Sequence, residues 1–296
     1  MADVVIKHAA TVVLLRDGAA GRPEVLMVKR HRKSAFMGSA YVYPGGKLDD
    51  DDTTETALGF CQGLSPQQAA QMMAPVGTRD PEDEPITPAQ AVGLFVAAIR
   101  EVFEESGLLL ADDEHGAQMD FTAPDVQERF ANWRTQLQQG KASMTQMAQQ
   151  EKLTYNLEGL VYFSHWITPP IEKRRFNTRF FLTRAPKGQT PLQDNHEVVD
   201  ARWLTPKEAL ELGDSGKIML APPTARTLED LSAFDTVDDA LKAAATQPVI
   251  TILPRFDSVD GEMTLFMPRD PRFAHPASVP GMTSMAMRDG RWRSVR

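Results

Sequence analysis

The sequence contains a single cysteine, Cys61, among its 296 residues. One thiol can form neither a disulfide within the chain nor a cysteine zinc site, and it is typical of proteins from a reducing compartment. No run of about 18 apolar residues is present, so the sequence predicts no membrane span. The first residues include an acid and lack the apolar core of a signal peptide. We therefore expect a cytoplasmic protein.

Positive charge is in the minority, because 32 Lys and Arg stand against 40 Asp and Glu, for a formal net charge of −8. This balance argues against general binding to nucleic acid, whose phosphates attract basic surfaces. A small phosphate-rich ligand would need a local basic patch or a metal ion. Hydrophobic residues make up 42% of the chain and charged residues 24%, which is typical of a globular protein.

The strongest local signal is a helix from Thr87 to Ser106. Thr87-Pro88-Ala89-Gln90 supplies a capping Thr, a Pro at the first helical position and a Gln three residues after the cap. Gly107 is a natural left-handed stop. At about 3.6 residues per turn, one side of this helix is apolar. That side carries Val92, Phe95, Val96, Ile99, Val102 and Phe103.

The opposite side of the predicted helix carries Glu101, Glu104 and Glu105. Side chains three and four residues apart share a face, so these carboxylates repel one another. The C-terminus of a helix is also the unfavourable end for negative charge. A positive partner should offset that cost, and Mg²⁺ or Mn²⁺ suits hard carboxylate oxygens. A solvated acidic face is the alternative.

Residues 100–108 read Arg-Glu-Val-Phe-Glu-Glu-Ser-Gly-Leu. This string resembles the second half of the Nudix box, the signature of hydrolases that act on nucleoside-diphosphate-linked compounds. Tyr43-Pro44-Gly45-Gly46-Lys47-Leu48-Asp49 is similar to the first half, but a long insertion separates the two. The first carboxylate of the family's box falls on Asp52 or on Asp49, and both assignments stay open.

A box split in this way is similar to the coenzyme A and acyl-coenzyme A diphosphatase-like branch of the Nudix family. Supporting stretches are residues 25–30, 164–169, 175–181, 201–204 and 221–224. The resemblance implies an α+β fold, a Nudix-like α/β/α sandwich with a mixed β-sheet, in a single domain over residues 1–296. The residue pattern adds inserts at about 50–88 (inside the box) and 112–153 (a helical cap), and a C-terminal helical extension at about 205–296.

The resemblance also implies a set of metal ligands. Glu101, Glu104 and Glu105 would hold Mg²⁺ or Mn²⁺, with the Gly45 carbonyl as an extra ligand. Arg100 would orient a box carboxylate through a forked salt bridge.

The resemblance leaves the group that activates the attacking water open. Glu104 or Glu105 is the family-based choice for this general base. Glu197 is the rival, because the family often places an acid in its neighbourhood, and Asp200 comes next.

Several arginines are candidates for binding the phosphates of the substrate, because guanidinium forks match phosphate oxygens. They are Arg30 and Arg32, which precede the glycine loop, and Arg174, Arg175 and Arg179. The alternatives to phosphate binding are equally open. The first two arginines would then lie in a solvated loop, and the other three would form surface ion pairs.

Three functions remain in competition. The first is metal-dependent hydrolysis of coenzyme A or acyl-coenzyme A to 3′,5′-ADP and (acyl-)4′-phosphopantetheine. The second is the same chemistry on ADP-ribose, dinucleoside polyphosphates or NAD(H). The third is a Nudix-fold binding module without catalysis, which the intact box glutamates disfavour. The partner is then a small-molecule nucleoside diphosphate, and a homodimer is the default expectation for the family.

The remaining patterns predict short elements. We expect strands over 8–15, 25–29, 41–43, 157–167, 176–182 and 198–204, and another that begins at Leu108. We expect helices over 66–73, 205–212, 222–233 and 236–245, and a late hairpin of 249–253 with 263–267. His165 is expected to be structural.

Overall fold

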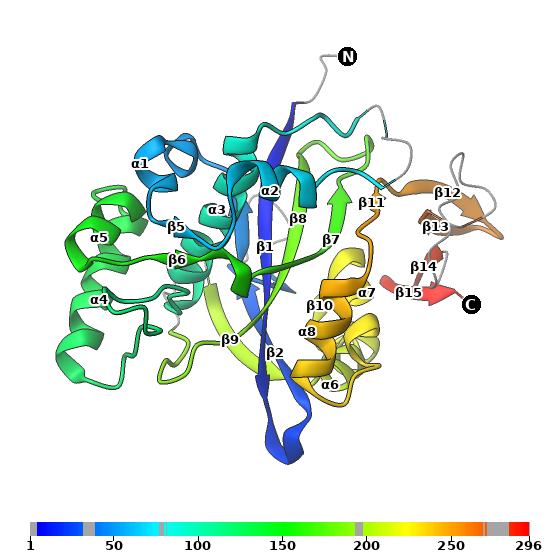
Figure 1. Ribbon diagram of the computed structural model, residues 1–296. Coiled ribbons are helices and arrows are strands. Elements are labelled where there is room, and N and C mark those ends of the chain that lie inside the picture. Colours follow the sequence, from blue (N-terminus) through cyan, green and yellow to red (C-terminus); the bar gives the residue numbers. More distant parts are fainter. Residues whose placement is uncertain are drawn as a thin grey trace.

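The computed structural model describes residues 5–31, 39–76, 80, 82–192, 198–268, 270 and 284–295. In these residues a mixed β-sheet lies between two helical layers (Figure 1). One layer contains α3 (Pro88–Ser106), and the other contains α6 (Pro206–Asp214), α7 (Pro222–Leu231) and α8 (Val237–Thr246). The α+β sandwich predicted from the sequence is confirmed.

The central sheet has nine strands in the described part of the chain, in the order β10-β3-β2-β1-β8-β7-β11, with β4 also paired to β1 and β9 to β2. The strands are β1 (Ile6–Asp17), β2 (Pro23–Arg30), β3 (Ala40–Val42), β4 (Gly45–Lys47), β7 (Val161–Ile167), β8 (Arg175–Arg184), β9 (Val198–Leu204), β10 (Met219–Leu220) and β11 (Thr251–Ile252). β1 and β8 are parallel, whereas β7 and β8 are antiparallel. The main predicted strands are therefore present.

β1 and β2 diverge away from their shared turn, and the glycine loop enters the sheet between them. The two strands pair only near their shared turn, where Leu15 lies opposite Val25. Farther from the turn, β4 takes the edge of β1, with Gly45 opposite Thr11. β3 takes the edge of β2 in the same way. The loop therefore enters the sheet as a short strand, and ladder hydrogen bonds hold its glycines in place.

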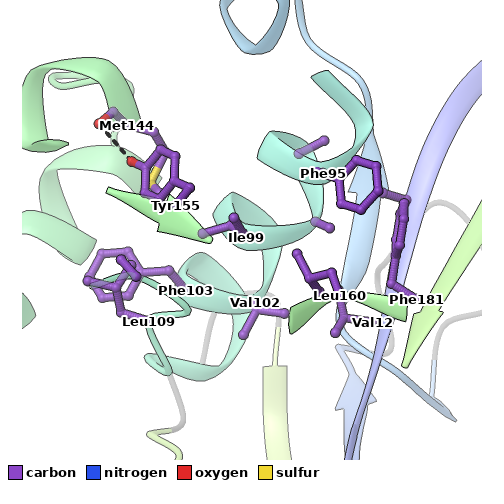
Figure 2. Close-up of a cluster of buried hydrophobic side chains, with 14 of the residues drawn as sticks. Val12, Phe95, Ile99, Val102, Phe103, Leu109, Met144, Tyr155, Leu160 and Phe181 are labelled. Atoms are coloured by element: carbon purple, nitrogen blue, oxygen red, sulfur yellow. Dashed lines mark hydrogen bonds between the residues drawn. The ribbon is translucent and has the colours of Figure 1, made fainter. Parts of the chain in front are cut away.

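A buried apolar cluster fixes α3 on the sheet (Figure 2). The six residues predicted for the inner face of this helix expose 2% of their surface or less. The rings of Phe95 and Phe181 are 4.6 Å apart and tilted by 47°. Full burial of one such side chain contributes about 1.5–3 kcal/mol. The acidic face of the helix is consequently held in one position relative to β4.

The two segments predicted to be inserts lie beside α3. The first holds η2 (Asp50–Thr53), α1 (Glu55–Leu58), β5 (Cys61–Gln62) and α2 (Pro66–Met72), which confirms the helix predicted there. The second holds α4 (Pro124–Gln138) and α5 (Met144–Glu151), and β6 (Tyr155–Asn156) and η3 (Leu157–Gly159) directly follow it. β5 and β6 pair in parallel, with Cys61 opposite Tyr155. The first insert therefore pairs with the segment that directly follows the second.

The C-terminal part differs from the prediction. β12 (Arg255–Val259), β13 (Glu262–Phe266), β14 (Ser284–Arg288) and β15 (Arg291–Val295) form a separate antiparallel sheet. The expected hairpin of 249–253 with 263–267 is wrong, because β13 pairs with β12, whereas β11 joins β7 in parallel at the edge of the main sheet. The helical description of 205–296 therefore holds only through α8.

The strand expected at Leu108 is also absent from the described structure. The carboxamide of Gln189 accepts a hydrogen bond from the Leu109 N–H over 2.8 Å and donates one to the Leu109 carbonyl over 3.1 Å. Because one side chain satisfies both backbone groups, this segment needs no strand partner. Among the described helices, none is both long enough and apolar enough to cross a bilayer.

Candidate active site

The box helix α3 begins and ends as its sequence predicts. The Thr87 hydroxyl accepts a hydrogen bond from the Gln90 N–H over 3.2 Å, and the Gln90 side chain accepts one from the Thr87 N–H over 2.9 Å. Gly107 closes the helix with φ 75°, a left-handed conformation that strains other residues. The three glutamates therefore lie in the last turns, on a helix with both ends defined.

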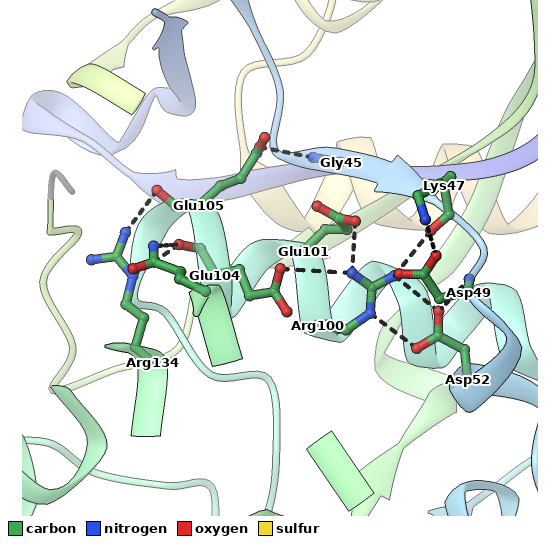
Figure 3. Close-up of polar contacts among 10 residues, drawn as sticks. Gly45, Lys47, Asp49, Asp52, Arg100, Glu101, Glu104, Glu105 and Arg134 are labelled. Atoms are coloured by element: carbon green, nitrogen blue, oxygen red, sulfur yellow. Dashed lines mark hydrogen bonds and ion pairs between the residues drawn. The ribbon is translucent and has the colours of Figure 1, made fainter. Parts of the chain in front are cut away.

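The glycine strand β4 approaches the acidic face of α3 closely (Figure 3). The Gly45 N–H donates to Oε2 of Glu105 over 3.0 Å. A Cβ on Gly46 would lie 2.2 Å from Oε1 of Glu101. Only glycine lets the strand and that carboxylate come so near to each other. The two halves of the box, distant in sequence, thus meet in space.

Arg100 is at the centre of the ion pairs beside this strand (Figure 3). Its Nε and Nη2 donate to the two oxygens of Asp52 over 3.0 and 2.9 Å, which is the forked geometry expected from the sequence. Its Nη1 donates to Oε1 of Glu101 over 2.8 Å, and its Nη2 also donates to the Lys47 carbonyl over 2.9 Å. Arg100 therefore connects the start of the first insert to the box helix and orients Glu101.

Asp52 and Asp49, the two acids left open by the sequence, have different environments. Asp52 is 2% exposed and makes the fork, whereas the Asp49 side chain is 40% exposed and its nearest contact with Arg100 is 3.6 Å. Burial lowers the pKa of Arg100, but the hydrogen bonds of Asp52 and the charges of nearby acids outweigh it and raise that pKa above its usual value. Arg100 is thus a permanent positive charge among the acids.

The carboxylates of α3 have the donor chemistry of a divalent-ion site, because Mg²⁺ and Mn²⁺ prefer oxygen ligands. The absence of a side chain at Gly46 suits this use, since a Cβ there would displace Glu101. Among the described residues, no three His, Cys, Asp or Glu side chains converge in the arrangement of a metal site. Glu101 faces Arg100, and Glu105 faces the Gly45 N–H. The residues fit such an ion by chemistry, and their side chains must turn to share it.

A family model described as the NUDT19 Nudix domain matches residues 6–231. The chain belongs to the Nudix hydrolase family. The resemblance carried by the split box is therefore confirmed, and with it the family-wide use of divalent metal ions.

Similar proteins extend this assignment. The chain is 32% identical to "Acyl-coenzyme A diphosphatase NUDT19" of Xenopus laevis over 241 residues, which cover 74% of this chain and 62% of the relative. It is 28% identical to the Homo sapiens protein of the same name, with coverage of 74% and 63%. The match thus spans less than two thirds of the length of these two relatives.

A crystal structure of a Nudix hydrolase from Alicyclobacillus acidocaldarius has the same fold. It superposes with a TM-score of 0.59 at 29% identity, and the match covers 83% of this chain and all of that one. The nine-stranded sheet and box helix described above are therefore a Nudix arrangement.

Two of the arginines predicted to bind phosphate are buried in this Nudix protein. Arg175 is 8% exposed, donates to the Thr168 carbonyl over 2.8 Å and pairs with Glu82. Arg179 is 2% exposed, and its Nη2 lies 3.7 Å from Asp83. Both side chains connect the first insert to β8. These contacts favour the ion-pair alternative left open by the sequence, and substrate contact by these two stays a prediction.

The other predicted substrate residues keep their status as predictions. Arg30 ends β2 opposite Val198, a residue of the buried cluster under α3, and thus lies on the box-helix side of the sheet. Arg174 is exposed and directly precedes β8. Arg32 and Glu197 lie outside the described residues.

Asp200, the next choice after Glu197 as general base, faces away from α3. It accepts hydrogen bonds from the Tyr41 hydroxyl over 2.5 Å and from Nε of Arg202 over 2.6 Å. Tyr41 belongs to the buried cluster on the α6–α8 side of the sheet. Burial and the bond to Asp200 raise the pKa of Tyr41 to about 12. We therefore remove Asp200 from the candidates.

One buried polar cluster escaped the sequence analysis. Asp83, in an acidic stretch of the first insert, is 3% exposed. Its Oδ1 accepts a hydrogen bond from Asn177 over 3.0 Å, and its Oδ2 accepts one from Thr251 over 3.1 Å. His165, 2% exposed, bonds to both Asn177 and Thr251. Burial, then the charge of Arg179, lowers the pKa of His165 to about 4. The cluster fastens the first insert to β7, β8 and β11, consistent with the structural role expected for His165.

Proposed function

We propose that this protein hydrolyses the pyrophosphate linkage of coenzyme A or acyl-coenzyme A, giving 3′,5′-ADP and (acyl-)4′-phosphopantetheine. The observation that carries the proposal is the contact of the glycine strand with the acidic face of α3, next to the Asp52–Arg100 fork. The names of the relatives, acyl-coenzyme A diphosphatases, support the choice of substrate.

The chemistry follows from the charge of the substrate. A pyrophosphate repels an incoming nucleophile, and a bound divalent ion supplies charge neutralisation and a more acidic water. We assign Mg²⁺ or Mn²⁺ to this role, held by Glu101, Glu104, Glu105 and the Gly45 carbonyl. Arg100, held by its fork to Asp52, keeps Glu101 oriented through Nη1.

The remaining roles concern the water and the phosphates. Glu104 or Glu105 takes the proton of the attacking water, and Glu197 is the alternative base. Arg30 and Arg174, with Arg32, bind substrate phosphates.

We further propose that the whole chain is a single Nudix domain with two inserts and acts in the cytoplasm. It would act on a small molecule rather than on nucleic acid or at a membrane, and would do so as a homodimer.

A substrate panel tests the proposal. Wild-type protein, E104Q and E105Q would be incubated with coenzyme A, acetyl-coenzyme A and ADP-ribose, each with and without Mg²⁺, and the products identified by mass. We expect 3′,5′-ADP from the wild type only with Mg²⁺, and a loss of about 10²–10⁴-fold in kcat in the variants. E128Q, which removes an exposed carboxylate on α4, is the matched control and should keep full activity.

Each other result has a clear meaning. Equal release of product by wild type and E104Q would exclude catalysis at this site and favour a binding module. Cleavage of ADP-ribose without cleavage of coenzyme A would replace the substrate while keeping the reaction.

A further inference from the structure

The last four carbonyls of a helix lack a partner among its helical residues, and in α3 each of them has a partner in its cap or in another segment. The Phe103 carbonyl accepts from the Gly107 N–H over 2.9 Å, and the Ser106 carbonyl from the Leu192 N–H over 2.7 Å. The other two carbonyls belong to Glu104 and Glu105, the proposed catalytic residues. Their partners come from the second insert.

Arg134 of α4 bonds to both of these carbonyls (Figure 3). Its Nε donates to the Glu104 carbonyl over 2.9 Å, and its Nη2 donates to the Glu105 carbonyl over 3.1 Å. One turn later, Nε2 of Gln138 donates to the Glu104 carbonyl over 2.8 Å. The insert thus supplies a forked cap to the end of the box helix.

The position of Arg134 on its own helix makes this contact specific. Phe130, Trp133 and Leu137 lie on the same face of α4 and are buried in the cluster beside α3. Arg134 shares that face and is 5% exposed. Burying a guanidinium among apolar side chains is unfavourable unless its donors are used. The cap satisfies that requirement and places a positive charge at the negative end of the helix.

We propose that Arg134 is a positioning residue for the reaction: its fork fixes the backbone of Glu104 and Glu105, so that their carboxylates can turn to share one divalent ion. The proposal rests on the proposed function of these two acids. A guanidinium is planar and donates along two parallel directions, whereas an ammonium cannot bridge two carbonyls in the same way. We therefore expect the geometry of the two hydrogen bonds, rather than the charge of Arg134, to position Glu104 and Glu105.

The test compares R134M and R134K with R129M and R129K. Arg129 lies on the same helix, and its ion pairs among the described residues are with Asp125 and Glu151 rather than with α3. It is therefore the matched control. Mn²⁺ binding without substrate is measured by electron paramagnetic resonance. The melting temperature, kcat and KM are measured on the same samples.

We expect both Arg134 variants to bind Mn²⁺ about 10-fold more weakly and to lose about 10–100-fold in kcat, with KM nearly unchanged. The Arg129 variants should match the wild type. If only the charge of Arg134 matters, R134M should bind Mn²⁺ more tightly than the wild type, because a nearby positive charge has been removed. R134K should then behave as the wild type. This pair of results would overturn the proposal. A lower melting temperature with unchanged Mn²⁺ affinity and kcat also overturns it.

Two further measures keep the test decisive. Q138L removes one donor to the Glu104 carbonyl from an exposed side chain, so it should fold even if R134M does not, and we expect an intermediate loss of Mn²⁺ affinity. The Mn²⁺ measurement needs no substrate. If the wild type fails to cleave coenzyme A, the substrate proposal fails while the effect on Mn²⁺ binding still decides the role of Arg134.

Discussion

Replacing Gly46 with alanine should remove activity while leaving the fold intact. The added Cβ would lie 2.2 Å from Oε1 and 2.4 Å from Cδ of Glu101. Ordinary contacts to a Cβ begin near 3.4 Å, so the carboxylate must retreat by about 1 Å. Glu101 can move, because it is the far end of a flexible side chain. The strand can therefore keep its place while the proposed ligand loses its position.

The expected loss in G46A is about 100-fold in kcat, or ~2.7 kcal/mol of transition-state stabilisation, since a shift of about 1 Å in a reacting geometry has effects of this size. Steady-state hydrolysis of coenzyme A over a range of Mg²⁺ concentrations measures it. We also expect a higher Mg²⁺ requirement. The melting temperature should change by only a few degrees.

Gly45→Ala is the matched control, with the opposite outcome. Its Cβ would lie 2.5 Å from the Ala10 carbonyl oxygen and 2.8 Å from Cα of Thr11, and these backbone atoms of β1 cannot move aside. We expect G45A to lower the free energy of unfolding by roughly 1–3 kcal/mol. A G46A protein with wild-type kcat and Mg²⁺ dependence would refute the placement of Glu101 in the reaction.

Two further predictions concern stability. D52N should lower the free energy of unfolding in urea by about 3–5 kcal/mol, because it leaves Arg100 buried without its main partner. D49N, the control, should change it by less than about 1 kcal/mol. Equal effects of the two variants would contradict the assignment of the forked ion pair to Asp52. The pKa of His165 is about 4 in the folded protein, below its ordinary value of about 6.5. As the pH falls below about 6.5, His165 is therefore protonated in the unfolded chain before it is protonated in the folded protein. The free energy of unfolding decreases as a result. The wild type should lose about 2 kcal/mol between pH 8 and pH 5 from this group, and H165Q should lack that part of the pH dependence.

The box helix could be predicted in detail because its signals are local. The capping Thr87, the stop at Gly107 and the apolar spacing all lie within one segment, and each has one structural meaning. The meeting of Glu101 with Gly46 was predictable only through the resemblance to a known box, because nothing in the sequence alone brings the two halves together across a long insertion.

Asp83 and His165 show where local patterns fail. A run of acids and prolines has the same composition whether it is solvated or buried, and the partners of Asp83 are Asn177 and Thr251, far along the chain. Arg134 did leave a signal: it is a cation on the apolar face set by Phe130 and Leu137. A charge at such a position needs buried acceptors, although the sequence does not say which ones.

The two inserts act on the box helix from different directions. The first brings Asp52 to Arg100, ahead of the acidic turns, and the second brings Arg134 to the carbonyls that end them. The β5–β6 pairing joins the first insert to the segment that directly follows the second. The proposed catalytic acids therefore depend on contacts distant in sequence, and replacing Asp52 or Arg134 should alter catalysis without touching a glutamate.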